Sequence, residues 1–178
     1  MRFETLNSED QYQGRAFSVR RDAVRLPNGK TTKLDVVVHS GAVTILPVDE
    51  NGDIWFVRQY RHPAGLEILE LPAGTLEDGE DPVACAHREI QEEIGMRATN
   101  LEKIGQFFLA PGYSTEFMHV YLATDLSPSS LPADEDEFLN VEKYAVDRAF
   151  EMVQNGEIQD AKTLATFFLA RVILQTND

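Results

Sequence analysis

The sequence contains little of several features that would indicate other classes of protein. Its single cysteine, Cys85, excludes a disulfide within the chain, which agrees with a reducing cytoplasm. No apolar run is long enough to cross a bilayer, and the first residues lack the basic start and apolar segment of a secretory signal. We therefore expect a cytoplasmic protein that has no membrane partner.

Positive charge is also scarce, and its distribution along the chain is uneven. The net charge of −14 argues against nucleic acid as a partner, because such binding needs a basic surface. Residues 1–61 still hold nine of the sixteen Lys and Arg, whereas residues 62–178 hold twenty-two of the thirty Asp and Glu. The acidic part suits metal ions and the arginine-bearing part suits an anion, although a solvated acidic surface also explains most of these charges.

Strand and helix patterns fill the 178 residues, a length typical of about one domain. The amino-terminal part predicts a hairpin over residues 14–39, packed on the body or, as we prefer, on a second copy of the chain. Further strands are expected at residues 41–48, 54–60, 66–71, 101–109, 117–123 and 138–145. Helices are expected at 81–95, 147–155 and 160–175. Helical spacing in the last of these predicts core positions for Leu164, Phe167, Phe168 and Val172.

The segment from Gly74 to Met96 contains the strongest candidates for functional residues. On its expected helix, Glu89, Glu92 and Glu93 fall within one narrow sector at ~100° per residue. Carboxylates this close repel one another, and a cation relieves the repulsion. Mg²⁺ prefers oxygen ligands, so the cluster predicts a Mg²⁺ site in which Mn²⁺ could substitute. A separate apolar stripe is expected to face the core, formed by Val83, Ala86, Ile90 and Ile94.

The same segment resembles the signature of the Nudix hydrolases, G-x5-E-x7-R-E-U-x-E-E-x-G-U, in which U is aliphatic. All nine fixed positions are filled, by Gly74, Glu80, Arg88, Glu89, Ile90, Glu92, Glu93, Gly95 and Met96. The resemblance implies an α/β fold, the Nudix α/β/α sandwich with a mixed central sheet, over residues 41–178. Residues 1–40 resemble an amino-terminal antiparallel β extension of one branch, which implies a homodimer formed through these strands.

That branch is the ADP-ribose pyrophosphatases, which also cleave other nucleoside diphosphate sugars. Three features carry the resemblance: Pro111, sixteen residues after Gly95, the segment 58–61 (RQYR), and the acidic run 134–137. They imply a Mg²⁺-dependent hydrolase that yields a nucleoside monophosphate and a sugar phosphate. The signature also fits a nucleoside triphosphate or dinucleoside polyphosphate hydrolase, and a Nudix-fold ligand sensor without catalysis remains a further alternative.

The resemblance also implies which residues hold the metal. Glu89 and Glu93 would be the main ligands. Glu92 and the main-chain carbonyl of Ala73 would complete the site, and Glu80 would support it or bind one of the ions.

Further roles follow from the same resemblance. Arg88 would orient the carboxylates. Glu135 would be the base that activates water, with Glu137 as a neighbouring ligand or substitute. Contacts to the nucleoside diphosphate sugar are implied for Arg58, Arg61, Glu70 and Phe17, the last as a stacking residue.

Overall fold

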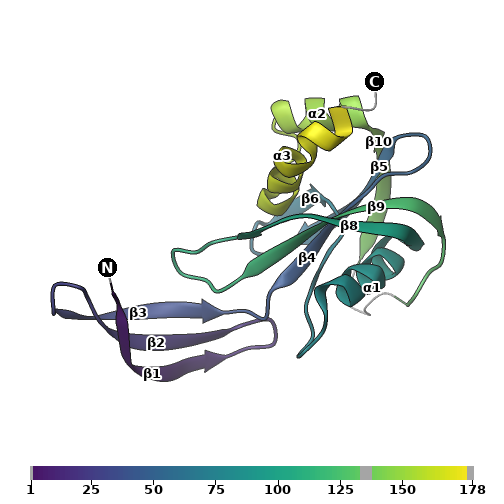
Figure 1. The fold of residues 1–178 in the computed structure, drawn as a ribbon. Helices are drawn as coiled ribbons and strands as arrows, with labels where there is room; N and C mark the ends of the chain where they lie inside the picture. The colour runs from purple at the N-terminus through teal and green to yellow at the C-terminus, as the bar shows by residue number, and fades with distance from the viewer. Residues whose placement is uncertain (1, 133–137, 176–178) are drawn as a thin grey trace. The chain divides into compact units, whose positions relative to one another are not determined.

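The computed structural model describes residues 2–132 and 138–175 (Figure 1). Residue contacts divide the chain into two units, residues 1–41 with 108–117 and residues 42–107 with 118–178. Within the described ranges, none of the helices has the length and apolar character needed to cross a bilayer.

The first unit contains a three-stranded antiparallel sheet in the order β1-β2-β3. Its strands are β1 (Glu4–Gln13), β2 (Ser18–Arg25) and β3 (Thr31–Val38). The expected hairpin corresponds to β2 and β3. β1 was not anticipated, because its side chains are mostly polar. All of them are exposed, and the strand is defined by its pairing with β2.

The turn formed by residues 108–117 belongs to this first unit. Val37 N donates to Tyr113 O at 2.8 Å, and Thr115 N donates to Val37 O at 2.9 Å. The Thr115 hydroxyl accepts from His39 N at 2.9 Å and donates to His39 O at 3.2 Å. The end of β3 is therefore joined to the turn by main-chain and side-chain hydrogen bonds.

The second unit contains two sheets. An antiparallel sheet in the order β10-β5-β6 is formed by β5 (Asp53–Arg61), β6 (Leu66–Glu70) and β10 (Leu139–Ala145). The other sheet has the order β7-β4-β9-β8, and its strands are β4 (Ala42–Pro47), β7 (Ala73–Thr75), β8 (Met96–Phe108) and β9 (Phe117–Pro128). It is mixed, because β4 pairs in parallel with β9 and in antiparallel with β7.

Several strand limits differ from the sequence-based expectation. β8 begins at Met96 instead of residue 101, and β9 continues to Pro128 instead of ending at residue 123. A short strand, β7, also forms where Pro72 and Gly74 suggested only a break. Pairing between neighbouring strands extends these elements through residues whose own strand signal is weak.

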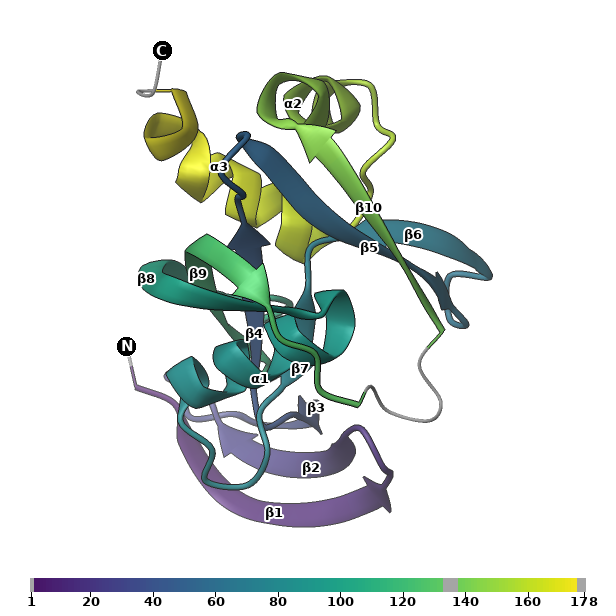
Figure 2. The ribbon, with the colours of Figure 1, turned by 90° about the vertical axis from the view of Figure 1, so that its right-hand side faces the viewer.

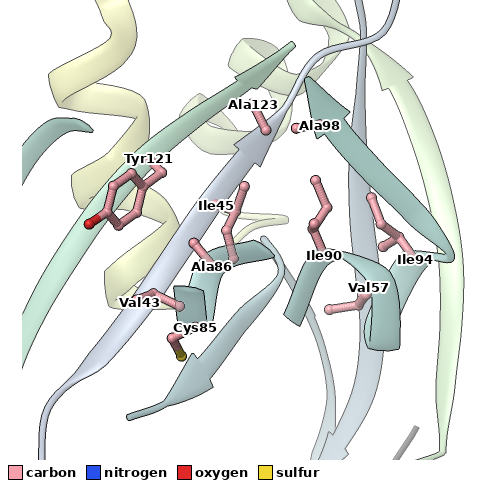
Figure 3. Packing of buried hydrophobic residues seen from close by; sticks show 10 residues of the cluster. All are labelled: Val43, Ile45, Val57, Cys85, Ala86, Ile90, Ile94, Ala98, Tyr121 and Ala123. Atoms are coloured by element: carbon pink, nitrogen blue, oxygen red, sulfur yellow. The ribbon is translucent and has the colours of Figure 1, made fainter. Parts of the chain in front are cut away.

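Three helices are described in the second unit: α1 (Pro82–Ile94), α2 (Val146–Gln154) and α3 (Ala161–Gln175). β4 is buried along its whole length, and successive side chains of a strand point to opposite faces. Val43 and Ile45 pack with Ala86 and Ile90 of α1 (Figure 3). Leu46 lies in a second cluster whose other members come partly from α2 and α3. The strands therefore lie between α1 and the α2–α3 pair, which confirms the α/β/α sandwich (Figures 1 and 2).

Two expectations about core residues were wrong in part. In α3, Phe167 is buried, but Phe168 and Val172 are 78% and 73% exposed. Apolar and polar side chains are spread around this helix, so its sequence does not show which face meets the sheet. Val83 of α1 is also exposed, at 42%, in the first turn of its helix.

Candidate active site

Helix α1 begins and ends where its sequence predicts. The Asp81 carboxylate accepts hydrogen bonds from Val83 N at 2.9 Å and Ala84 N at 3.3 Å, and Pro82 occupies the first turn. Gly95 ends the helix in the left-handed conformation, with φ 68°, a region that glycine enters without strain. These caps fix where the helix starts and ends, and the packing of Ala86 and Ile90 in the core sets the direction of its glutamates.

Arg88 is the centre of the carboxylate cluster. Its Nε and Nη2 donate to the two carboxylate oxygens of Glu80 at 3.1 and 3.0 Å. Its Nη1 donates to Glu89 Oε1 at 2.6 Å and to Glu92 Oε2 at 2.9 Å. The hydrogen bond from Arg88 lowers the pKa of Glu80. In turn, the hydrogen bond to Glu80 and the neighbouring carboxylates of Glu89 and Glu92 raise the pKa of Arg88. Arg88 thus contacts three carboxylates of the cluster, and its role in orienting them remains a prediction.

Gly74 gives Glu89 the space that it occupies. A Cβ atom added at Gly74 would lie 1.8 Å from both Cδ and Oε1 of Glu89. Real Cβ contacts essentially never fall under 3.0 Å, so no other residue fits beside this carboxylate without a shift. Glu89 itself is only 7% exposed. Any side chain at position 74 would therefore displace the Glu89 carboxylate from this place.

Glu93 is fixed against the strand that precedes the helix. Its Oε2 accepts a hydrogen bond from Ala73 N at 2.9 Å, and the residue is 5% exposed. The main chain of Ala73 thus lies beside the Glu93 carboxylate. Three of the residues predicted for the metal site, Glu89, Glu93 and Ala73, therefore lie where α1 packs beside β7.

The donor set suits a hard divalent cation. Glu80, Glu89, Glu92 and Glu93 supply carboxylate oxygens, which Mg²⁺ and Mn²⁺ prefer, and Arg88 offsets only part of their charge. Among the described residues, no three His, Cys, Asp or Glu side chains form a preorganised metal-binding site. Arg88 occupies oxygens of Glu89 and Glu92, so binding a cation there would exchange at least one of these hydrogen bonds.

A second charged group lies at the end of β5. Arg61 Nε and Nη2 donate to the two oxygens of Glu70 at 2.8 and 2.7 Å. Glu70 is 1% exposed and also accepts from Lys162 of α3. Hydrogen bonding to Glu70 outweighs burial and raises the pKa of Arg61, and the charge of Glu93 adds to the rise. Arg61 therefore lies within the electrostatic reach of the α1 cluster.

Arg58 has a different environment. Its Nη2 donates to Glu142 Oε2 at 3.1 Å, its Nε donates to Glu142 Oε1, and the Tyr144 hydroxyl also donates to Glu142. The hydrogen bond from Arg58 lowers the pKa of Glu142. Burial raises this pKa, but its effect is smaller. The predicted contact of Arg58 with substrate remains a prediction, and its guanidinium is already paired.

Three further residues were predicted to act on the substrate: Phe17, Glu135 and Glu137. Phe17 belongs to the first unit, in the turn between β1 and β2, where it is 44% exposed with its ring 6.2 Å from that of Tyr12. Glu135 and Glu137 lie outside the residues that the structure describes. Lys162 and Glu142 were not predicted from the sequence. Each is more than eighty positions from its partner in the chain, and no local pattern joins them.

Comparisons with known proteins agree with this geometry. The Nudix domain model matches residues 38–167, which contain the whole α1 cluster. The chain belongs to the Nudix family. Residues 3–33 of this Nudix protein match the nucleoside diphosphate sugar hydrolase N-terminal domain, so β1 and β2 also have a counterpart in a known family.

Two curated relatives span most of the chain. The ADP-ribose pyrophosphatase of Bacillus subtilis is 41% identical over 90% of this chain and 88% of its own length. The methanol dehydrogenase activator of Bacillus methanolicus is 38% identical over 90% of this chain and 88% of its own length. A solved structure described as an ADP compounds hydrolase has a TM-score of 0.87 and 25% identity, covering 99% of this chain and 96% of that one. The chain is thus a Nudix family member whose amino-terminal segment matches a domain of nucleoside diphosphate sugar hydrolases.

Proposed function

We propose that this Nudix hydrolase cleaves the diphosphate bond of ADP-ribose, or of a closely similar nucleoside diphosphate sugar, with Mg²⁺ as cofactor. The observation that carries the proposal is the arrangement of the signature glutamates on α1, with Glu89 beside Gly74 and Glu93 beside Ala73. The name of the Bacillus subtilis relative supports ADP-ribose as the sugar nucleotide. The products would be a nucleoside monophosphate and a sugar phosphate.

The metal would be held by Glu89, Glu92 and Glu93, together with the main-chain carbonyl of Ala73. When bound, Mg²⁺ supplies positive charge that screens the diphosphate and lowers the pKa of water. Arg88 holds Glu89 and Glu92 near one another before the ion arrives, and binding the ion would exchange at least one of these hydrogen bonds. Mn²⁺ has a similar preference for oxygen ligands and would substitute for Mg²⁺.

Two other groups would act on the substrate. The Arg61 guanidinium, held at Nε and Nη2 by Glu70, would use Nη1 to bind a phosphate oxygen. Glu135 would take the proton of the attacking water, and Glu137 would replace it if the base lies two residues later. A carboxylate base within hydrogen-bond reach of the water contributes ~10²–10⁴-fold to the rate.

The test is a hydrolysis screen of the purified protein with Mg²⁺, Mn²⁺ or EDTA. The substrates are ADP-ribose, ADP-glucose, GDP-mannose and UDP-glucose, with ATP and diadenosine tetraphosphate for the alternative hydrolase activities. We expect metal-dependent release of AMP from ADP-ribose and little turnover of the two polyphosphates. Faster turnover of ATP or diadenosine tetraphosphate would refute this substrate class. Tight binding of ADP-ribose without turnover in either metal would favour the sensor alternative.

We also propose that two copies of the chain pair through the amino-terminal sheet and that the protein works in the cytoplasm. β1 is the edge of its sheet, and an unpaired strand edge offers main-chain groups to a second strand. Large apolar side chains are exposed on and beside it, with Phe3 and Tyr12 each 58% exposed and Leu6 42% exposed. Light scattering should show a dimer, and a chain that lacks residues 1–13 should be monomeric.

A further inference from the structure

The first turn of α3 is joined to β6 by a chain of polar contacts. Lys162 Nζ donates to Glu70 Oε2 and, at 3.0 Å, contacts Asp160 Oδ2. The Thr163 hydroxyl donates to Asp160 Oδ2 at 2.6 Å and accepts from Leu71 N at 2.9 Å. Two successive residues of α3 therefore bind two successive residues at the end of β6.

The burial of these groups differs in a way that matters for Arg61. The side chains of Glu70 and Lys162 are 2% and 11% exposed, whereas that of Arg61 is 42% exposed. A buried carboxylate is stable only when it is paired and hydrogen-bonded. Burial alone would raise the pKa of Glu70, but Arg61 and Lys162 outweigh burial and lower it. Lys162 thus holds the inner side of Glu70, and Arg61 extends from Glu70 towards solvent.

We propose that Lys162 is a positioning residue, which acts through Glu70 to hold the Arg61 guanidinium ready for the diphosphate of the substrate. The proposal rests on the proposed function, in which Arg61 binds that diphosphate. A long, half-exposed arginine otherwise samples many rotamers, and fixing one of them at the moment of binding weakens affinity. The paired Glu70 fixes that rotamer in advance.

The arrangement also keeps the charge of Arg61 available. Glu70 shares its negative charge between two cations, because Oε2 accepts from both Lys162 and Arg61. Without Lys162, Glu70 would have Arg61 as its only described cationic partner. The pair would then attract an anion less strongly. Substrate affinity should therefore depend on a lysine that has no predicted contact with substrate.

The kinetic test compares Lys162→Met with Lys162→Arg, which keeps the charge. A matched control is Lys143→Met, which removes a lysine that also contacts a carboxylate, at 3.5 Å from Asp49. We expect Lys162→Met to raise the KM for ADP-ribose about tenfold, equivalent to ~1.4 kcal/mol, with kcat changed less than about twofold. Lys162→Arg should restore KM to within about threefold of wild type, and Lys143→Met should leave both constants unchanged. A loss confined to kcat, with KM unaltered, would overturn the proposal.

A second measurement does not depend on turnover. The ¹⁵N relaxation of the Arg61 Nε–H group, assigned with Arg61→Lys, reports the order of this side chain on the ps–ns timescale. We expect an ordered group in wild type and Lys162→Arg and a mobile one in Lys162→Met. Lys162→Gln serves in the same way if the methionine variant does not fold. An equally ordered Arg61 in the uncharged variants would refute the positioning role, whether or not ADP-ribose is the substrate. Absence of turnover in wild type, with the expected relaxation, would instead refute the proposed function alone.

Discussion

Replacing Gly74 with alanine should disable this enzyme, although it adds only one methyl group. The new Cβ would lie 1.8 Å from the Glu89 carboxylate, and ordinary contact begins at 3.4 Å. Glu89 would have to move by about 1.6 Å, and a misplacement of about 1 Å in a catalytic group can cost about 10²-fold in rate. We expect kcat/KM for ADP-ribose in Mg²⁺ to fall at least about 100-fold.

The overlap should also lower the free energy of unfolding, by about 1–3 kcal/mol, as for other overpacked sites. Denaturant unfolding would measure this loss. Gly112→Ala is a matched control, because a Cβ added at Gly112 would meet nothing within 4 Å. This control should retain wild-type stability and turnover to within about twofold.

A double-mutant cycle separates the overlap from other effects of the added methyl group. On a Glu89→Ala background the carboxylate is absent, so Gly74→Ala should change the free energy of unfolding by less than about 0.5 kcal/mol. The same penalty on both backgrounds would show that the methyl group meets something other than Glu89. Wild-type turnover in Gly74→Ala would show that the position of Glu89 is unimportant for catalysis.

Further predictions concern the metal, the base and a surface pair. Chelation by EDTA should abolish turnover, and either Mg²⁺ or Mn²⁺ should restore it. Glu93→Gln should lower turnover by about 10²–10³-fold, with weaker Mg²⁺ binding in calorimetry. Glu135→Gln should slow turnover by about 10²–10⁴-fold with Mg²⁺ binding retained, whereas the larger effect in Glu137→Gln would identify Glu137 as the base. Arg58→Met should cost about 1 kcal/mol of unfolding free energy at pH 7, because Arg58 lowers the pKa of Glu142. This difference should be complete above the unfolded pKa, about 4.3, and should disappear as pH falls through the lowered pKa of Glu142; a difference that does not change with pH would contradict it.

The sequence predicted those parts of the fold that depend on local patterns. Residues a few positions apart predict the two helix caps, Asp81 and Gly95. They also predict the helix sector shared by Glu89, Glu92 and Glu93. β1 could not be predicted in this way, since its mostly polar side chains are all exposed and its pairing with β2 is what makes it a strand. Local patterns therefore identified helix α1 and missed an entire strand.

The contacts of the candidate site show the same difference between local and long-range pairs. Contacts of Arg88 with Glu89 and Glu92 span one and four residues, and the helical period makes them visible in the sequence. The contact of Lys162 with Glu70 spans 92 residues and depends on how α3 packs against β6. Nothing in either neighbourhood specifies it. Long-range ion pairs of this kind require the tertiary structure.

The hydrogen bonds between β3 and the turn at residues 108–117 limit how this protein can be recombined with its relatives. Val37 and His39 exchange hydrogen bonds with Tyr113 and Thr115. These two segments, distant in the sequence, therefore form one structural unit that must be transferred together. A chimera that transplants only residues 1–40 would bring a β3 end whose main-chain groups at residue 39 need a hydroxyl at position 115, and a recipient turn without it would leave them without this partner. A functional exchange of the amino-terminal sheet would therefore carry both segments, and variation between relatives in one should be accompanied by compensating change in the other.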